Sequence, residues 1–341
     1  MSISNEVARE DSSASPSIDS PSPFCVTIPR LQKAWDNSSL QLLKDCPRKY
    51  QYAILEGWRP KHTAAPLIFG SMYHNGLEEY DTLRGRGADH ATALRAAIRK
   101  VMIETTWEED GKLIFWDAGD NNRSRESLVR SIVWYCEHFK EDALQTYILP
   151  DGTPAIELSF RYELPLSSPD LDPYFYCGHL DKLAKMGDML YVVERKTSTS
   201  TLSSSYFARY NPNGQITGYA FSAKVVLNEP VQGVIVDATQ TAVNFARFGR
   251  SYQHRNEEQL EEWLSNTLVW IKVAEDYAKA NYWPMNEEAC HKYSGCQYRE
   301  VCSKSALTRD KWLESDFLRN PWNPLVVRGG SKDGVAEEIK S

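Results

Sequence analysis

The feature that most limits the possible folds is a change of pattern near residue 154. Before it, apolar residues follow helical spacing, for example at about 89–108 and 124–147. After it, four segments have strand lengths and strand patterns: "AIELSFRYELPL", "YFYCGHLDKLAKM", "MLYVVERKTS" and "VQGVIVDATQ". A helical segment, "NPNGQITGYAFSAKVV", separates the last two, and a long helix is expected at 255–282. This order predicts an α/β (α+β) protein with a mostly helical first half and a small mixed sheet flanked by helices.

The composition places this fold in a globular protein. The chain has 341 residues, of which 42% are hydrophobic, enough for a sizeable core. We expect a disordered tail at 1–26, because Ser, Pro and acids dominate it, and a flexible tail at 323–341. A single domain at 27–322 is expected between them, with a helical insertion at 85–150 and a catalytic core at 154–240.

The same sequence limits location and partners. Its apolar runs are shorter than a membrane span, and its start lacks the apolar centre of a secretory signal, so we predict a cytoplasmic protein. The net charge of −7 argues against a wholly basic nucleic-acid coat protein but does not exclude a local basic groove.

The run "NSSLQLLKDCPRKYQYAILEGW" predicts the first helix of the helical half. Ser38 or Ser39 can cap this helix, and Pro47 is expected to kink or restart it. The run "FGSMYHNGLEEYDTLRGRG" predicts a second helix, which the glycines at its end terminate.

The strand "VVERKTS" ends in charged residues whose positions suggest chemistry. Residues i and i+2 of a strand share a face, so Glu194 and Lys196 point together while Arg195 points away. A turn at 186–188 places Asp181, on the preceding strand, nearly opposite Glu194. Two close carboxylates repel unless a cation lies between them, and Mg or Mn takes oxygen ligands of this kind. Such a site can perform metal-assisted phosphodiester hydrolysis, with the lysine orienting or deprotonating the attacking water and offsetting developing charge.

Each of these residues also has an ordinary structural explanation. Acids and bases on adjacent strands commonly form a solvated face with weak ion pairs. Gln215 and Tyr219 are four residues apart and share one face of the following helix, which would face the strand ends. His74 lies in a predicted helix, where it is either a nitrogen ligand for a metal or a packed or exposed histidine.

Taken in order, "GSMYHNGLEEY", "GHLDKLA", "VVERKTS" and "QITGYA" resemble the RecB-type branch of the PD-(D/E)XK nuclease superfamily, which includes CRISPR-adaptation-type exonucleases. The resemblance covers roughly residues 38–303, with 85–150 matching only as generic helices. It implies a restriction-endonuclease-like core. It also implies a metal site formed by four residues: His74, Asp181, Glu194 and, through its backbone carbonyl, Arg195.

The resemblance further assigns roles around this metal. It makes Asp181 and Glu194 catalytic carboxylates and Lys196 the catalytic lysine. Gln215 and Tyr219 become the catalytic helix motif, and Tyr219 borders the DNA strand. The implied function is Mg- or Mn-dependent hydrolysis of DNA, as an exonuclease on single strands or DNA ends, in recombination, repair or phage DNA processing.

Seven cysteines in an apparently intracellular chain favour reduced thiols or metal ligands over a disulfide framework. Cys290, Cys296 and Cys302 are separated by five residues each, and these loops fit an iron–sulfur cluster better than zinc. The resemblance implies a 4Fe-4S cluster held by Cys46 together with these three, which would connect the N-terminal helix to the C-terminal loop. The other three are expected to be small buried hydrophobes: Cys25, Cys136 and Cys177.

Basic residues next to Cys46 complete the predicted nucleic-acid interface. Arg48 and Lys49 are expected to contact DNA phosphates. The sequence contains no GxxxxGKS/T nucleotide loop, so any ATP-driven unwinding would need a helicase or recombination partner. Two alternatives stay open: a catalytically silent DNA-binding or scaffold subunit, and a zinc-stapled interaction protein. The oligomeric state is left open as well.

Overall fold

The central sheet explains how distant parts of the chain meet. The computed structural model describes residues 22–28, 30–227, 229–292 and 295–327. Within these residues a sheet of seven strands has the order β1-β7-β8-β9-β10, and β5 and β6 also pair with β7. The β1–β7 and β8–β9 pairs are parallel and the others antiparallel, which confirms the predicted mixed sheet. The strands are β1 (Ala34–Trp35), β5 (Gln145–Thr146), β6 (Ile156–Ser167), β7 (Pro173–Met186), β8 (Met189–Ser198), β9 (Val231–Thr241) and β10 (Ala246–Gln253).

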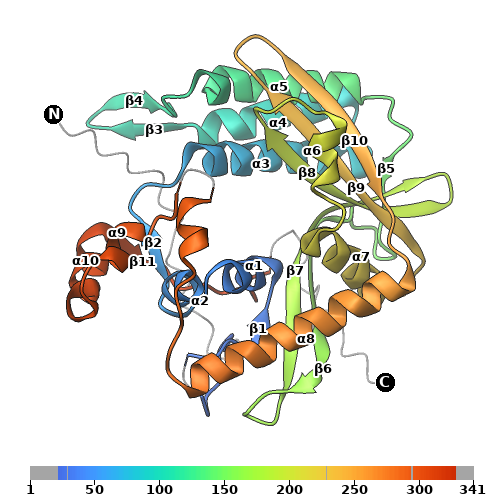
Figure 1. Ribbon diagram of the computed structural model, residues 1–341. Helices are drawn as coiled ribbons and strands as arrows, with labels where there is room; N and C mark the ends of the chain where they lie inside the picture. The colour runs from blue at the N-terminus through green and yellow to red at the C-terminus, as the bar shows by residue number, and fades with distance from the viewer. Residues whose placement is uncertain (1–21, 29, 228, 293–294, 328–341) are drawn as a thin grey trace.

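Helices cover both faces of this sheet (Figure 1). Alternation along β9 separates the two faces: Val236 packs in the core cluster with Ile216 of α7, whereas Asp237 contacts Tyr135 of α5. The first face carries α7 (Gly214–Leu227) and α8 (Glu257–Lys279), and α6 (Ser204–Ala208) precedes them in the chain. The second face carries the bundle of α3 (Ala65–Gly85), α4 (His90–Glu104) and α5 (Arg125–His138). Gly76 of α3 lets α5 approach closely, because a Cβ at this position would lie only 2.7 Å from Ile132.

The two ends of the described chain pack together. Strand β2 (Trp58–Pro60) pairs antiparallel with β11 (Phe317–Arg319), although more than 250 residues separate them. The remaining helices at this end are α1 (Asn37–Asp45), α2 (Pro47–Tyr50) with a π-helical turn at Gln51–Leu55, α9 (Arg299–Ser303) and α10 (Arg309–Asp316). The helix therefore restarts at Pro47, as predicted.

Several sequence predictions need correction. The N-cap of α1 is Asp36, neither Ser38 nor Ser39. The Asp36 carboxylate accepts a hydrogen bond from the Ser39 N–H, and the Ser39 hydroxyl oxygen accepts one from the Asp36 N–H. The predicted helix at 89–108 ends at Glu104 and gives way to a hairpin, β3 (Thr106–Glu109) and β4 (Lys112–Phe115), within the supposed helical insertion. Strand β10 was not predicted.

The predicted tails lie mostly outside the described residues, which exclude 1–21 and 328–341. At the inner edges of both tails the chain is packed. Cys25 is buried and its N–H donates to the Leu31 carbonyl, and Pro324 is also buried. Buried residues therefore occur within the inner edges of both predicted tails, and the bounds 27–322 stay a prediction. Cys136 and Cys177 are buried, as expected for core thiols.

Candidate metal site and nucleic-acid interface

The site forms where β7 and β8 separate. The two strands are joined by a two-residue turn with Met186 paired to Met189 and Gly187 at φ +60°, and their pairing runs back to Lys182 and Val193. One step further the register would pair Asp181 with Glu194, as predicted. At this step the Asp181 carboxylate accepts the Arg195 N–H at 2.8 Å, while β8 continues beside β9. The Asp181 side chain thus takes the place of a backbone acceptor in the β7–β8 pairing, and the two strands separate beyond this point.

Glu194 and Lys196 lie together at this opening. Their side chains form an ion pair, in which the Lys196 ammonium donates to Oε1 of Glu194. Glu194 is only 3% exposed, and its second oxygen, Oε2, has no hydrogen-bond partner among the described residues. A buried carboxylate oxygen without a partner carries a large desolvation cost. Oε2 of Glu194 is therefore an oxygen that a cation could bind.

The ionisation of the carboxyl groups reflects the same excess of negative charge. Burial, reinforced by Asp181, raises the pKa of Glu194 to about 7. Burial acts in the same direction on Asp181, but His74, Lys196 and the Arg195 N–H outweigh it and lower the pKa of Asp181 to about 2. Burial works against the ammonium of Lys196, yet Glu194 raises its pKa. Lys196 is therefore held as a cation.

Two further side chains reach Asp181 from other elements. His74 of α3 places Nδ1 3.6 Å from Oδ2 of Asp181, and that carboxylate raises the pKa of the imidazole although burial opposes it. Ligand atoms of His74, Asp181 and Glu157 lie within 4.8 Å of one another. Imidazole and carboxylate groups at this separation could hold a divalent metal ion.

Glu157 is the residue that the sequence prediction missed. It lies in "AIELSF", on the strand paired with the strand of Asp181, and its backbone has φ +49°. A non-glycine residue at positive φ is uncommon and concentrates at functional sites. The sequence shows an acid in the preceding strand, but it does not show the backbone conformation that turns this acid toward the site.

The predicted helix motif also reaches the strand ends. The Lys196 ammonium donates to Oε1 of Gln215 at 3.2 Å, and Nε2 of Gln215 donates to the Tyr219 hydroxyl at 3.1 Å. A hydrogen-bonded chain therefore connects β8 to the first turns of α7. The structure thus gathers His74, Asp181, Glu194, Lys196, Gln215 and Tyr219 in one region, as expected.

Arg195 points to the other side of β8, also as predicted. Its guanidinium is buried and pairs with Asp81 of α3, which Lys182 approaches at 3.1 Å. Next to it, Tyr135 of α5 donates to Asp237, which also pairs with Arg250 at 3.1 Å. This buried network, which the sequence did not predict, fixes α3 and α5 to the sheet.

The cysteines occupy a different region, where the two ends of the chain meet. The Asn286 N–H lies 3.4 Å from Sγ of Cys46, so the C-terminal loop returns to the first helices. Burial raises the pKa of Cys302 to about 11, and Cys296 and Cys46 add to this effect. The four thiols do not lie at metal-binding distance from one another; among the described residues, only His74, Glu157 and Asp181 form such a group. The 4Fe-4S cluster and its zinc alternative are therefore not supported by the geometry.

The predicted DNA contact at Arg48 also needs correction. Arg48 is buried, its Nε donates to the Trp283 carbonyl at 2.8 Å, and its guanidinium lies over the Tyr282 ring. This side chain ties α2 to the segment after α8, and its burial leaves little of it accessible to a DNA phosphate. Lys49 is half-buried, and its contact with DNA stays a prediction.

The mixed sheet and the charged opening between β7 and β8 are features of a nuclease fold, and comparison with known protein families identifies it. Residues 35–303, well over half of the chain, match the family described as the PD-(D/E)XK nuclease superfamily. The chain belongs to this superfamily, whose members are nucleases that use divalent metals.

Comparison with solved structures gives more distant similarities. A crystal structure of a "Putative exonuclease" from Eubacterium rectale is 12% identical, covers 81% of this chain and 92% of its own, and has a TM-score of 0.46. SSO0001 is 12% identical, covers 80% of this chain and 86% of its own, and has a TM-score of 0.33. Neither similarity carries a functional conclusion. No curated protein matches the sequence. None of the described helices combines the length and apolar character of a membrane span.

Proposed function

We propose that this protein is a metal-dependent deoxyribonuclease that acts as an exonuclease on single-stranded DNA or DNA ends. One observation carries the proposal: Oε2 of Glu194 is buried beside the carboxylate of Asp181 and has no hydrogen-bond partner in the described part of the chain. Membership in a nuclease superfamily supports the reaction type. A role in recombination, repair or phage DNA processing, a helicase or recombination partner and a cytoplasmic location are part of the same proposal.

The residues at the opening fit a hard cation such as Mg or Mn. Asp181 and Glu157 would supply carboxylate oxygens and His74 a nitrogen, all within 4.8 Å of one another. Glu194 lies outside this group and is proposed as a further ligand through Oε2. The backbone carbonyl of Arg195 is proposed as a further oxygen ligand. When bound, the metal would polarise the phosphate and lower the pKa of a bound water.

The neighbouring side chains have separate proposed roles. The ammonium of Lys196 is held between Glu194 and Gln215, which directs it toward the space beside the carboxylates. From there it can orient the attacking water and offset the charge that develops on the phosphate oxygens. Gln215 holds this lysine in place and is itself held by Tyr219, so both act on the reaction through the position of the ammonium.

The test is hydrolysis of labelled single-stranded and double-stranded DNA with Mg or Mn. We expect Glu194→Gln and Lys196→Ala each to lower the rate by about 10²-fold or more, because each removes charge from the reacting centre. Glu163→Gln is the matched control, since Glu163 is exposed on β6, and its activity should equal that of the wild type.

Comparison of linear with circular single strands separates exonuclease from endonuclease action. Equal rates in the wild type, Glu194→Gln and Lys196→Ala would remove the site assignment. No hydrolysis by the wild type, with DNA still bound, would favour the silent DNA-binding alternative.

A further inference from the structure

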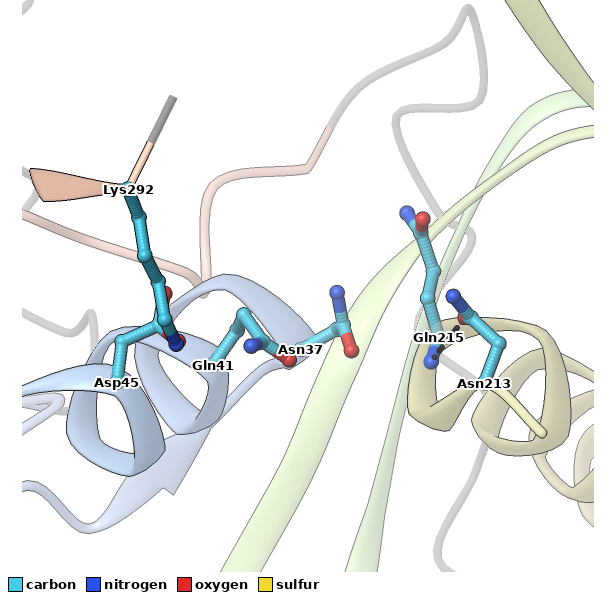
Figure 2. Close-up of a pocket in the computed structure, with 6 residues that line it drawn as sticks. All are labelled: Asn37, Gln41, Asp45, Asn213, Gln215 and Lys292. Carbon is cyan, nitrogen blue, oxygen red and sulfur yellow. Dashed lines mark hydrogen bonds and ion pairs between the residues drawn. The ribbon is translucent and has the colours of Figure 1, made fainter. Parts of the chain in front are cut away.

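A cavity of about 640 Å³ lies between α1 and the start of α7 (Figure 2). Figure 2 shows Asn37 and Gln41 on α1 at one side, Gln215 and Asn213 at the other, and Lys292 at the far end of α1. Asp45, the remaining lining residue, follows Gln41 by one turn, so α1 presents three polar side chains in a row. The volume falls in the range of ligand sites, roughly 300–1,000 Å³.

This cavity is joined to the candidate metal site by a single side chain. Gln215 lines the cavity and also accepts a hydrogen bond from the Lys196 ammonium at 3.2 Å. A strand whose phosphate lies beside Lys196 would therefore have its adjoining nucleotides within reach of α1.

The lining is neutral and rich in amides. Among the described lining residues the charged ones are Asp45 and Lys292, and they pair at 3.1 Å, so their charges cancel. The Asn213 carboxamide oxygen is occupied by the N–H groups of Gln215 and Ile216. Asn37 and Gln41, in contrast, have no side-chain hydrogen-bond partner within the described part of the chain, so both amides are available to a ligand.

Neutral amides suit bases better than phosphates. Each amide offers donors and an acceptor, which match the mixed donor and acceptor edges of nucleobases, whereas phosphates are bound mainly by cations. The Watson–Crick edges of a duplex are already paired, and only unpaired bases expose them. On the basis of the proposed nuclease function, we propose that this cavity binds unpaired bases next to the scissile phosphate and so selects single-stranded DNA.

The test measures binding without catalysis. Fluorescence anisotropy of a labelled single-stranded oligonucleotide and of a blunt duplex, both in EDTA, compares the wild type with Asn37→Ala/Gln41→Ala. The double variant lacks two hydrogen-bonding side chains, so its Kd for the single strand should be about tenfold higher or more. Its Kd for the duplex should change by less than about twofold. Gln232→Ala removes an exposed amide of β9 that does not line the cavity, and should change neither value.

The salt dependence separates this role from a phosphate contact. Because both amides are neutral, the slope of log K against log salt should be unchanged in the double variant, whereas loss of a phosphate contact lowers it. Gln41→Met is a second variant that keeps side-chain length and helix propensity, and it should weaken single-strand binding about fivefold with an unchanged melting temperature.

Three results would overturn the inference: unchanged single-strand binding in both variants, an equal loss on the duplex, or a wild type that binds no single strand. Failure of the proposed function looks different, because the wild type would then bind single strands through the cavity but hydrolyse none with Mg or Mn.

Discussion

Two clusters of charged residues lie on opposite sides of β8 and differ in charge balance. On the side of Glu194, three carboxylates (Glu157, Asp181 and Glu194) face one lysine and one histidine. On the side of Arg195, three carboxylates face three cations, in pairs formed by Asp81, Asp237 and Asp142 with Lys182, Arg195 and Arg250.

The balance explains what each cluster can do. On the Arg195 side, Nε of Arg195 and Oδ1 of Asp237 also lack hydrogen-bond partners among the described residues, but each carboxylate has a cation beside it, and Arg195 and Lys182 lower the pKa of Asp81 although burial opposes this. This side therefore holds helices to the sheet. On the other side, burial and Asp181 raise the pKa of Glu194 to about 7, and Oε2 of Glu194 has no hydrogen-bond partner among the residues that the structure describes. Unbalanced negative charge at an opening between strands is what a divalent cation would neutralise. Alternate residues of one strand therefore serve structure and chemistry separately.

The largest expected effect on stability comes from a substitution on the Arg195 side, where the charges are balanced. Asp81→Ala leaves Arg195 and Lys182 buried without a counterion, and this should cost roughly 3–5 kcal/mol of unfolding free energy. Urea denaturation with and without Mg measures it, and Mg should not restore the loss. Asp188→Asn, in the exposed turn after β7, should leave stability unchanged. A loss below about 1 kcal/mol would show that the network contributes little.

The second effect comes from adding the ion to the unbalanced side. Mn at 100 times its Kd should stabilise the wild type by about 2.7 kcal/mol, because it binds the folded state. Thermal unfolding measures this shift. It should disappear in Asp181→Asn and persist in Asp188→Asn. An equal shift in all three proteins would place the ion elsewhere.

The smallest expected change in the free energy of unfolding is a stabilisation, opposite in sign to the effect of Asp81→Ala. Glu194→Gln removes a buried charge whose Oε2 has no hydrogen-bond partner among the described residues, while keeping the shape of the side chain and an acceptor for Lys196. In EDTA it should stabilise the protein by on the order of 1 kcal/mol, although it should lower the rate of hydrolysis by about 10²-fold or more. Urea denaturation in EDTA measures the change. A destabilisation as large as that of Asp81→Ala would mean that both clusters are structural.

The parts of the site that the sequence predicted are those set by local geometry. The turn at Gly187 fixes the register, so the opposition of Asp181 and Glu194 follows from counting residues. Likewise, helical spacing alone places Gln215 and Tyr219 on one face. These relations need only the periods of strands and helices.

The parts that the sequence did not predict depend on distant contacts or on unusual backbone. Glu157 joins the site through a positive φ, and Asp81 reaches Arg195 from a helix more than 100 residues away. Arg48 was expected at the surface, but packing of the chain ends buries it against the Trp283 carbonyl. The four-cysteine cluster was predicted from spacing and resemblance, and it stays a prediction that iron and sulfide analysis of the purified protein can decide.

The most direct test of the shared cation is anomalous diffraction from a crystal grown with Mn. We expect an anomalous peak between the carboxylates of Asp181 and Glu194, with Oε2 of Glu194 among the ligands of the ion. A crystal in which Mn binds only elsewhere, with these two carboxylates unbridged, would contradict it.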